Sequence, residues 1–258
     1  IKKSVSIQFG KLPPQDKDIE RAVLGALMVD SNCLFIGIAK LFPEIFYDEG
    51  HSKVYNAIQM LYDRNSKIEA KGPTGGGTVL VGGDWQGSGD VRQATKVTME
   101  AGSTIDSSAT DQGDGGKVVL WSDVHNADSM TRVNGSIKAE AGPNGGDGGK
   151  VETSGHALSI DGLQVQTNAP AGEGGTWLLD PYDVTISSGA TATETLTAGV
   201  YTPSGNASVI NATTLRTNLN ATNGTVEIIT TGAGTQAGNI SIEANLAWTS
   251  SAKLKLSA

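Results

Sequence analysis

The chain has little of what disulfide-bonded, cysteine-ligated and membrane-spanning proteins use. One cysteine among 258 residues excludes an intrachain disulfide framework and a cysteine-rich metal site. No run approaches the roughly 18 apolar residues that a transmembrane helix needs. The opening Ile1-Lys2-Lys3 is basic, but neither an apolar stretch nor a cleavage site follows it. We therefore expect no signal peptide in this chain and, as given, no route out of the cytoplasm.

The loop that cradles nucleotide phosphates is also missing. That loop needs the pattern G-x-x-x-x-G-K-[ST]. The nearest segments, Gly116-Lys117-Val118 and Gly149-Lys150-Val151, lack the Ser or Thr, and Asp111 and Asn144 replace the first glycine. We expect no nucleotide-driven motor.

Catalytic and metal-binding patterns are scarce as well. His51, His125 and His156 have no ligand-like spacing and are predicted to be surface or packing residues. Cys33 lies in an apolar stretch and is predicted to be a structural thiol rather than a nucleophile. No Ser-His-Asp or Cys-His arrangement stands out. We predict a chain that is not an enzyme and has no catalytic, cofactor or metal site.

Two groups of acidic residues are possible exceptions to that prediction. The first fails the register of calcium-binding repeats, so its members are predicted to be solvated turn carboxylates: Asp111, Asp114, Asp123, Asp128 and Asp147. Polysaccharide-cleaving enzymes with stacked strands use acids clustered on one face. The second group would form such a cluster only if this chain also stacks its strands: Asp106, Asp123, Glu140, Glu152 and Asp161. The sequence alone does not show whether it does.

What the chain contains divides it into two regions. All four phenylalanines and the cysteine lie before Lys71-Gly72-Pro73, whereas all four tryptophans and 30 of the 34 glycines lie after it. Residues 1–70 hold nine Lys/Arg and nine Asp/Glu, so the net charge of −8 belongs to the rest. We predict two domains, 1–70 and 71–258. The acidic second region also argues against a phosphate-backbone binder, and no direct nucleic-acid site is evident.

The first region reads as helical. Ile19, Val23 and Leu27 are spaced to form one apolar helix face, with Asp16 as the N-cap. A second helix is predicted after Asp30 and ends at Pro43, and a third runs from about residue 51 to 65. The region is therefore predicted to be a small all-α segment.

Five short blocks in this region carry a family resemblance. They are Leu12-Pro13-Pro14-Gln15, Glu20-Arg21-Ala22-Val23-Leu24-Gly25-Ala26-Leu27-Met28, Ile45-Phe46-Tyr47, His51 and Lys67-Ile68-Glu69. In order and spacing, residues 10–69 resemble the N-terminal domain of DnaB-type bacterial replicative DNA helicases. The resemblance implies a cytoplasmic parent protein in which this domain forms a collar on a hexameric ring and contacts primase.

The second region is repetitive. Gly-Gly pairs at 76–77, 115–116, 148–149 and 174–175 each precede a short apolar segment. Such repeats are typical of a solenoid whose units stack, with glycine at sharp corners, often at positive φ. We find no helix periodicity anywhere in this region. The repeat pattern therefore predicts an all-β right-handed parallel β-helix over 71–258, whose uncapped ends favour self-association.

A second resemblance rests on four blocks of this region. They are 82–87, 115–122, 144–156 and 177–186. They resemble filamentous-haemagglutinin-like and high-molecular-weight adhesin exoproteins, which are exported by two-partner secretion. The resemblance implies a secreted or cell-surface β-helix that binds a host-cell or surface receptor, although the family's N-terminal secretion domain is missing here.

These observations give two functional hypotheses. The main one is a non-catalytic shaft of a bacterial surface adhesin joined to a partial helicase domain, in a chain that we interpret as a fusion. The alternative is a DNA-replication module, without motor activity, whose helical segment binds primase or helicase protomers.

Six N-x-[ST] sequons form a mild excess over chance in the second region, and related adhesins can carry sugars at such sites. Threonine-rich strand composition explains the excess equally simply. The candidate glycosylation sites are Asn134, Asn206, Asn211, Asn220, Asn223 and Asn239.

Overall fold

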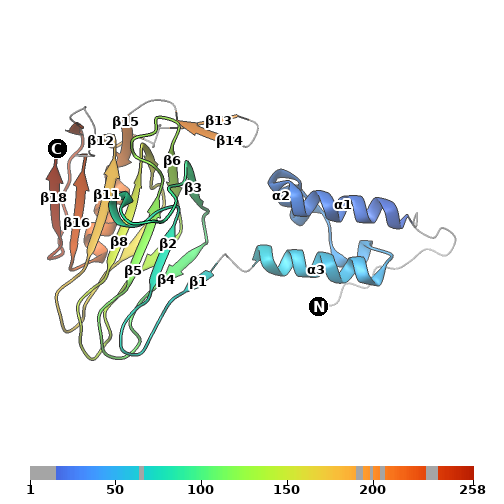
Figure 1. The fold of residues 1–258 in the computed structure, drawn as a ribbon, viewed down its shortest axis with the longest axis horizontal. Helices are drawn as coiled ribbons and strands as arrows, with labels where there is room; N and C mark the ends of the chain where they lie inside the picture. The colour runs from blue at the N-terminus through green and yellow to red at the C-terminus, as the bar shows by residue number, and fades with distance from the viewer. Residues whose placement is uncertain (1–15, 64–66, 190–193, 198–199, 204–206, 231–237) are drawn as a thin grey trace. The chain divides into compact units, whose positions relative to one another are not determined.

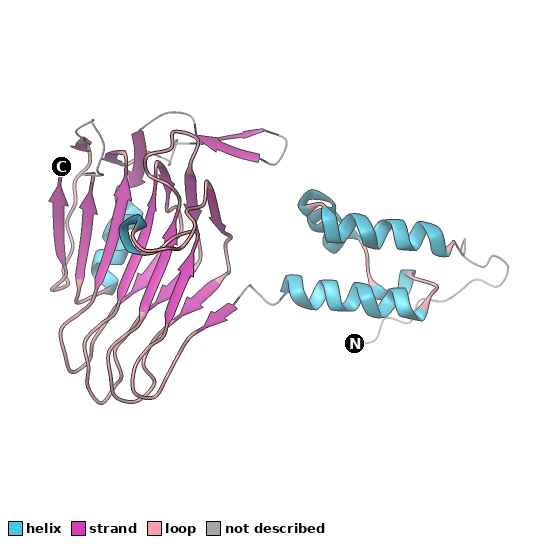
Figure 2. Cartoon of the chain, in the orientation of Figure 1, coloured by secondary structure: helices cyan, strands magenta, loops and turns pink. Residues whose placement is uncertain are grey.

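The computed structural model describes residues 16–63, 67–189, 194–197, 200–203, 207–230 and 238–258. The chain divides into two compact units, Ile1–Asn65 and Ser66–Ala258, which we call the helical unit and the sheet unit. Figure 1 shows the elements of each, and Figure 2 shows helices dominating the first and strands the second.

Three α-helices build the helical unit. They are α1 (Lys17–Val29), α2 (Ser31–Lys40) and α3 (Glu49–Asp63), with a 3₁₀ turn η1 (Pro43–Ile45) between the last two. The predicted N-cap of α1 is confirmed, because the Asp16 carboxylate accepts hydrogen bonds from the amides of Asp18 and Ile19 at 3.0 and 3.1 Å. Both α1 and α3 carry an acidic residue in their first turn, where the helix dipole favours negative charge.

The apolar face predicted for α1 is rotated in the structure. Leu24 and Leu27 are the buried residues of this helix, whereas Ile19 is 63% exposed. The core that they join contains Phe46 and Tyr55, with Val23 and Leu34 packed against it. The spacing therefore located the helix, but the partners supplied by η1 and α3 decide which side is buried.

Four of the five sheets of the sheet unit are parallel. The largest has the order β18-β16-β11-β8-β5-β2, and two more have the orders β1-β4-β7-β10 and β3-β6-β9. Their strands are β1 (Lys67–Glu69), β2 (Thr78–Val81), β3 (Lys96–Met99), β4 (Thr104–Asp106), β5 (Lys117–Trp121), β6 (Met130–Val133), β7 (Ser136–Lys138), β8 (Lys150–Gly155), β9 (Ala157–Ser159), β10 (Gln164–Gln166), β11 (Thr176–Pro181), β16 (Thr225–Ile229) and β18 (Lys253–Ser257).

The remaining sheets lie toward the C-terminus. The fourth parallel sheet has the order β15-β12-β17, and β13 and β14 form an antiparallel pair. Their bounds are β12 (Asp183–Ser187), β13 (Glu194–Thr197), β14 (Val200–Pro203), β15 (Ala207–Asn211) and β17 (Ile240–Ile242).

Side chains of the six-stranded sheet stack in columns because its strands pair without slippage. Val79 of β2 lies beside Val118 of β5, which lies beside Val151 of β8 and then Trp177 of β11. These four residues belong to the main core of the unit. Alternate residues point to the opposite face of a sheet, so Leu80, Val119, Glu152 and Leu178 form a second column on the outer face.

Close backbone approach, rather than positive φ, explains the Gly-Gly pairs. A Cβ on Gly149 would overlap the carbonyl oxygen of Gly116, and a Cβ on Gly175 would overlap that of Gly149. Neither glycine has a positive φ, although turn residues such as Gly113 and Gly146 do. The expectation of left-handed corners therefore holds for some turn glycines, while the repeated pairs are small because successive turns touch there.

The predicted all-β solenoid is contradicted, because the structure is mixed α/β with several parallel sheets. Helix α4 (Ala212–Ala221) interrupts the strands, capped by Asn211, which accepts the amides of Thr213 and Thr214 at 2.8 and 3.2 Å. Its Leu215 and Leu219 are buried in the main core. This four-residue spacing is the helix periodicity that the sequence interpretation missed.

Helix α4 also takes over a role that an all-β arrangement gives to a strand. The Asn218 side chain accepts the Val165 amide of β10 at 2.7 Å and donates to the Leu163 carbonyl at 2.9 Å. Strand β10 stands at the edge of its sheet, and a side-chain amide satisfies its backbone there.

Candidate functional site

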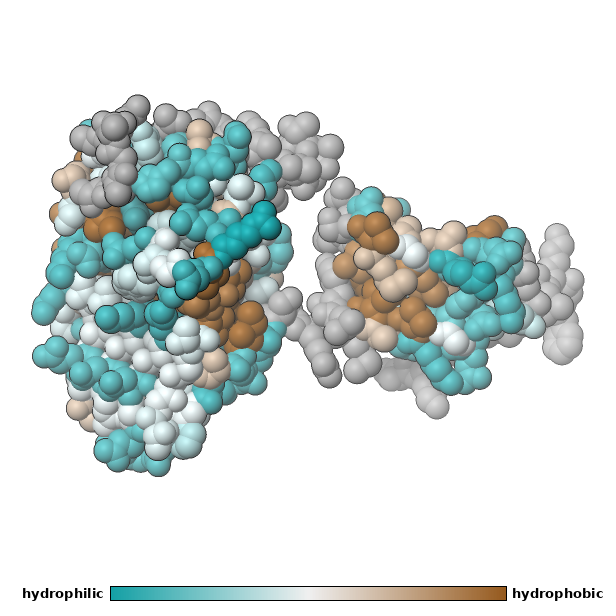
Figure 3. Space-filling model, viewed as in Figure 1, coloured by the Kyte–Doolittle hydropathy of each residue, from teal (hydrophilic) through white to brown (hydrophobic). Residues whose placement is uncertain are grey.

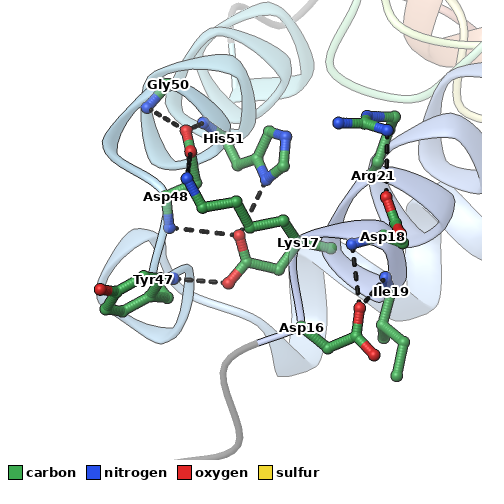
Figure 4. A network of polar contacts seen from close by, with 10 residues as sticks. Asp16, Lys17, Asp18, Ile19, Arg21, Tyr47, Asp48, Gly50 and His51 are labelled. Atoms are coloured by element: carbon green, nitrogen blue, oxygen red, sulfur yellow. Dashed lines mark hydrogen bonds and ion pairs between the residues drawn. The ribbon is translucent and has the colours of Figure 1, made fainter.

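In the helical unit, three sequence blocks meet at one carboxylate. Glu20 of α1 accepts the Tyr47 amide at 2.6 Å and the Asp48 amide at 3.2 Å, and its second oxygen lies 2.8 Å from His51 Nδ1 (Figure 4). Asp48 in turn accepts the amides of Gly50 and His51 at the start of α3 and pairs with Lys17 of α1 at 2.8 Å. The network fixes α1 against the beginning of α3.

The electrostatics of the network favour ionised carboxylates. Burial raises the pKa of Glu20, but the hydrogen bonds from His51, Tyr47 and Asp48 outweigh it, so the pKa lies below its usual value. The Lys17 ammonium, with help from the His51 amide, lowers the pKa of Asp48 to about 2. The site is thus a stable polar clamp rather than a proton-transfer centre.

Beside this clamp lies the small core of the unit. Tyr55 is fully buried, stacks at 5.2 Å on Phe46 and donates its hydroxyl to the Leu41 carbonyl at 2.9 Å. Clamp and core together hold the three helices as one scaffold.

That scaffold exposes many large apolar side chains. The helical unit contributes eight of the twelve exposed large hydrophobic residues in the described part of the chain: Ile19, Met28, Val29, Ile36, Phe42, Ile45, Tyr47 and Val54. Val29 is 89% exposed and Met28 64%. Brown side chains gather on the face of this unit seen in Figure 3. Apolar surface held by a rigid scaffold is typical of a protein-binding site.

The sheet unit holds a different feature, two buried carboxyl groups on adjacent strands. Glu152 of β8 and Asp180 of β11 are 0% and 5% exposed. Burial raises the pKa of each to about 7. Sequence reasoning considered Glu152 but missed Asp180, because only the register of β8 and β11 brings the two together.

The other candidate acids do not join Glu152. Asp106, Asp123, Glu140 and Asp161 are only partly buried, and Asp106 lies 3.7 Å from Lys71. The turn acids bond to neighbouring turns: Asp114 accepts the Asp147 amide, and Asp147 accepts the Glu173 amide, both at 2.8 Å. Among the described residues, no group of three or more His, Cys, Asp or Glu is placed to hold a metal ion.

The histidines and the cysteine have separate surroundings. His51 belongs to the clamp, His125 is exposed, and His156 is buried, with Nδ1 3.0 Å from the Val124 carbonyl and its ring stacked on Tyr182. Cys33 is partly buried in α2, and burial raises the pKa of its thiol. A raised thiol pKa disfavours the nucleophilic thiolate.

The candidate glycosylation sites divide by exposure. Asn220, Asn223 and Asn239 are exposed. The Asn223 side chain nevertheless accepts the Ala169 amide and donates to the Ala169 carbonyl. Asn134 and Asn211 are partly buried and engaged with backbone, and Asn206 lies outside the described residues. Glycosylation stays a prediction, and hexose increments in the intact mass of the native protein would test it.

Comparison with known proteins finds a family match in the N-terminal part of the chain. Residues 12–71 match the DnaB-like helicase N terminal domain. Among curated proteins, the replicative DNA helicase DnaB of Rhodothermus marinus is 36% identical over 62 residues, which cover 24% of this chain and 7% of the relative. The replicative DNA helicase DnaC of Bacillus subtilis (strain 168) is 39% identical over 59 residues, 23% of this chain and 13% of the relative. The chain spans only about a tenth of their length.

These matches correct several expectations. They contradict the adhesin interpretation, with its β-helical shaft, secretion and cell-surface location, because they point to DNA replication and give a haemagglutinin-like region no support. They also contradict the expectation that the chain is not an enzyme, since the matched relatives are replicative DNA helicases. The extracellular location is left without support. In the described part of the chain, no helix combines the length and apolar character that crossing a bilayer requires. Residues 12–71 are therefore similar to the N-terminal domain of replicative DNA helicases.

Proposed function

We propose that the helical unit is a protein-docking module for DNA replication, which binds helicase protomers or primase. The match of residues 12–71 to the DnaB-like N-terminal domain carries this proposal. The match also supports a cytoplasmic location, because the matched relatives are replication proteins. DNA unwinding itself is the activity named for the relatives, of which this chain covers a small part.

The physical argument rests on the combination of clamp and surface. Glu20 ties α1 to the two residues before α3 and to His51 within it through three hydrogen bonds, so little conformational entropy remains to be lost on binding. The apolar side chains that remain outside supply surface to be buried at about 25 cal/mol per Å². Phe42, 54% exposed, is an aromatic side chain of this surface that is able to anchor a contact.

Binding of the full chain to two separate probes tests the proposal. The probes are the replicative helicase of Bacillus subtilis and a bacterial primase, each followed by sedimentation velocity. We expect binding to at least one, and Phe42→Asn should weaken it by about tenfold or more. Val91→Asn, which changes an exposed apolar residue of the sheet unit, is the matched control and should bind normally. Absence of binding to both probes, or equal binding by the two variants, would overturn the proposal.

Self-association is a separate expectation. Strands β2 and β18 are the edges of the six-stranded sheet, and unpaired edges favour pairing between chains. The β18 edge carries Lys253 and Lys255, which oppose such pairing by charge. Sedimentation of the chain over a range of concentrations distinguishes the two tendencies, and a concentration-independent monomer would rule self-association out.

A further inference from the structure

A strap, residues 82–94, covers part of the outer face of the six-stranded sheet. It contains a short 3₁₀ turn, η2 (Trp85–Gly87), whose Trp85 packs with Leu80 against Val119 and Trp121. Gly83 and Gly87 lie so close to the Trp121 ring that a Cβ on either would overlap it. The strap therefore seals an apolar surface that the sheet alone would expose to water.

Specific polar contacts hold the strap in place. Asp84 pairs with Lys117 of β5 at 2.8 Å, and the Trp121 indole donates to Gln93 Oε1 at 3.2 Å. Gln86 has a φ of 52°, the one positive φ outside glycine among the described residues. This strained conformation directs the Gln86 amide to the Glu152 carboxyl, 2.8 Å away.

Glu152 is the buried group on which the strap closes. Its other oxygen accepts the Ser154 hydroxyl at 2.9 Å. The charged groups around it are Asp180 from β11 and Asp84 from the strap, both of which disfavour its ionisation. Lys117 is engaged by Asp84, and Lys150 of β8 lies 6.0 Å from the centre of the Trp85 ring.

Asp180 depends on burial alone. Burial raises its pKa, and within the described residues its carboxyl has neither a hydrogen bond nor an ion pair. The nearby His156 is already bonded to the Val124 carbonyl and stacked on Tyr182. A charge on Asp180 or Glu152 thus gains most of its stabilisation only if water reaches it.

We propose that the strap is a pH-sensitive cover, closed while Glu152 is protonated and released when it ionises. Opening hydrates the Glu152 carboxyl and uncovers the apolar surface around Trp121. The inference concerns the sheet unit and is independent of the function proposed for the helical unit.

The sign follows from linkage. With the strap closed, Glu152 titrates near pH 7, whereas a free glutamate carboxyl titrates near its ordinary value of 4.5. The closed form binds more protons between these values, so closure is fully favoured in acid and weakens as pH rises toward 7. The Gln86 amide bond favours the ionised form, but the burial effect exceeds it.

Hydrogen–deuterium exchange of the full chain tests the cover. After correction for the intrinsic chemical rate, the opening equilibrium of residues 82–94 should rise about tenfold or more between pH 5 and pH 8. Glu152→Gln, which keeps the shape without the charge, should remove most of this rise. Glu227→Gln is the matched control, because Glu227 occupies the equivalent outward position on β16 but does not bond to the strap.

Two further measurements keep the test decisive. Protection of the β8 and β11 peptides checks that Glu152→Gln remains folded, and Asp180→Asn gives a second route to the same reduction. Strap protection that does not change with pH in the wild-type chain would overturn the proposal. A wild-type profile in both Glu152→Gln and Asp180→Asn would overturn it as well.

Discussion

The two units achieve stability by different means, and the difference explains why one of them exposes apolar surface. Among the described residues, the main core of the sheet unit buries 25, whereas that of the helical unit buries four and relies on the Glu20 clamp. A small core leaves apolar helix faces outside, where a partner is able to cover them. The described part of the sheet unit leaves four large apolar side chains exposed, and the strap covers the apolar surface around Trp121.

The units also offer separate spectroscopic signals. All four tryptophans lie in the sheet unit and most helical residues lie in the helical unit, so tryptophan fluorescence and far-UV circular dichroism follow them separately. Coincident transitions by both probes would show that the units unfold together, which would contradict the view that each unit is stabilised separately.

Glycine provides the largest expected effect. Gly149→Ala should destabilise the sheet unit by about 3 kcal/mol, because its Cβ would overlap the Gly116 carbonyl of the adjoining turn and no flexible side chain is there to yield. Fluorescence-detected denaturation measures the loss. Gly189→Ala is the control, since its Cβ would lie 3.4 Å from Ser187 Oγ, an ordinary contact. Equal stability of the two variants would show that the turns are able to separate.

The glycine repeat shows both the reach and the limit of the sequence. The spacing of Gly76-Gly77, Gly115-Gly116 and Gly148-Gly149 located turns that stack, and their strands pair in register. It did not show that carbonyl contacts, rather than positive φ, require the glycines. Helix α4 was missed because strand-like segments surround it and its apolar positions, Leu215 and Leu219, span little more than one turn.

The candidate sites show the same limit. Glu20, Tyr47 and His51 were recognisable as parts of a family pattern, but only the fold shows that they meet. The proximity of Glu152 to Asp180 depends on the register between two strands whose paired residues, such as Lys150 and Thr176, are 26 positions apart in the chain, which single-residue patterns do not encode. The exposed side of α1 likewise depends on its partners.

A smaller effect is expected in the core of the helical unit. Tyr55→Phe should lower its stability by about 1 kcal/mol, because the Leu41 carbonyl loses a hydrogen bond while the ring packing remains. Circular dichroism measures it, with Tyr47→Phe as a control at a side chain that is 57% exposed. A change in the fluorescence transition instead would mean that the units are coupled.

A glycine-to-alanine change should stabilise the helical unit, in contrast to Gly149→Ala in the sheet unit. Gly25→Ala should stabilise α1 by about 0.5–1 kcal/mol, since nothing lies within 4 Å of the added Cβ and alanine loses less entropy in a helix. Gly50→Ala is its counterpart, because that Cβ would lie 2.9 Å from Asp48 Oδ1 and should give no gain. Thermal midpoints by circular dichroism compare them, and a destabilised Gly25→Ala would contradict the open site on α1.

A fall in pH should have opposite effects on the two units. The folded-state pKa of Asp48 is lowered from 3.8 to about 2, so its contribution to the helical unit is present above pH 3.8 and is lost as pH falls toward 2. The strap responds in the opposite sense, since it closes as pH falls. Lys17→Met removes the main cause of the shift and should flatten the acid limb of the circular dichroism midpoint between pH 5 and pH 2.5.

Arg21→Met is the matched control for that titration. Its partner Asp18 is 89% exposed and the Arg21 side chain 71%, so water screens the pair and its loss should leave the acid limb unchanged. If Lys17→Met and Arg21→Met gave the same profile, the Lys17–Asp48 pair would be no more than a solvated surface contact. The clamp would then depend on Glu20 and His51 alone, and the rigidity that the docking proposal assigns to α1 and α3 would have to come from the apolar core beneath them.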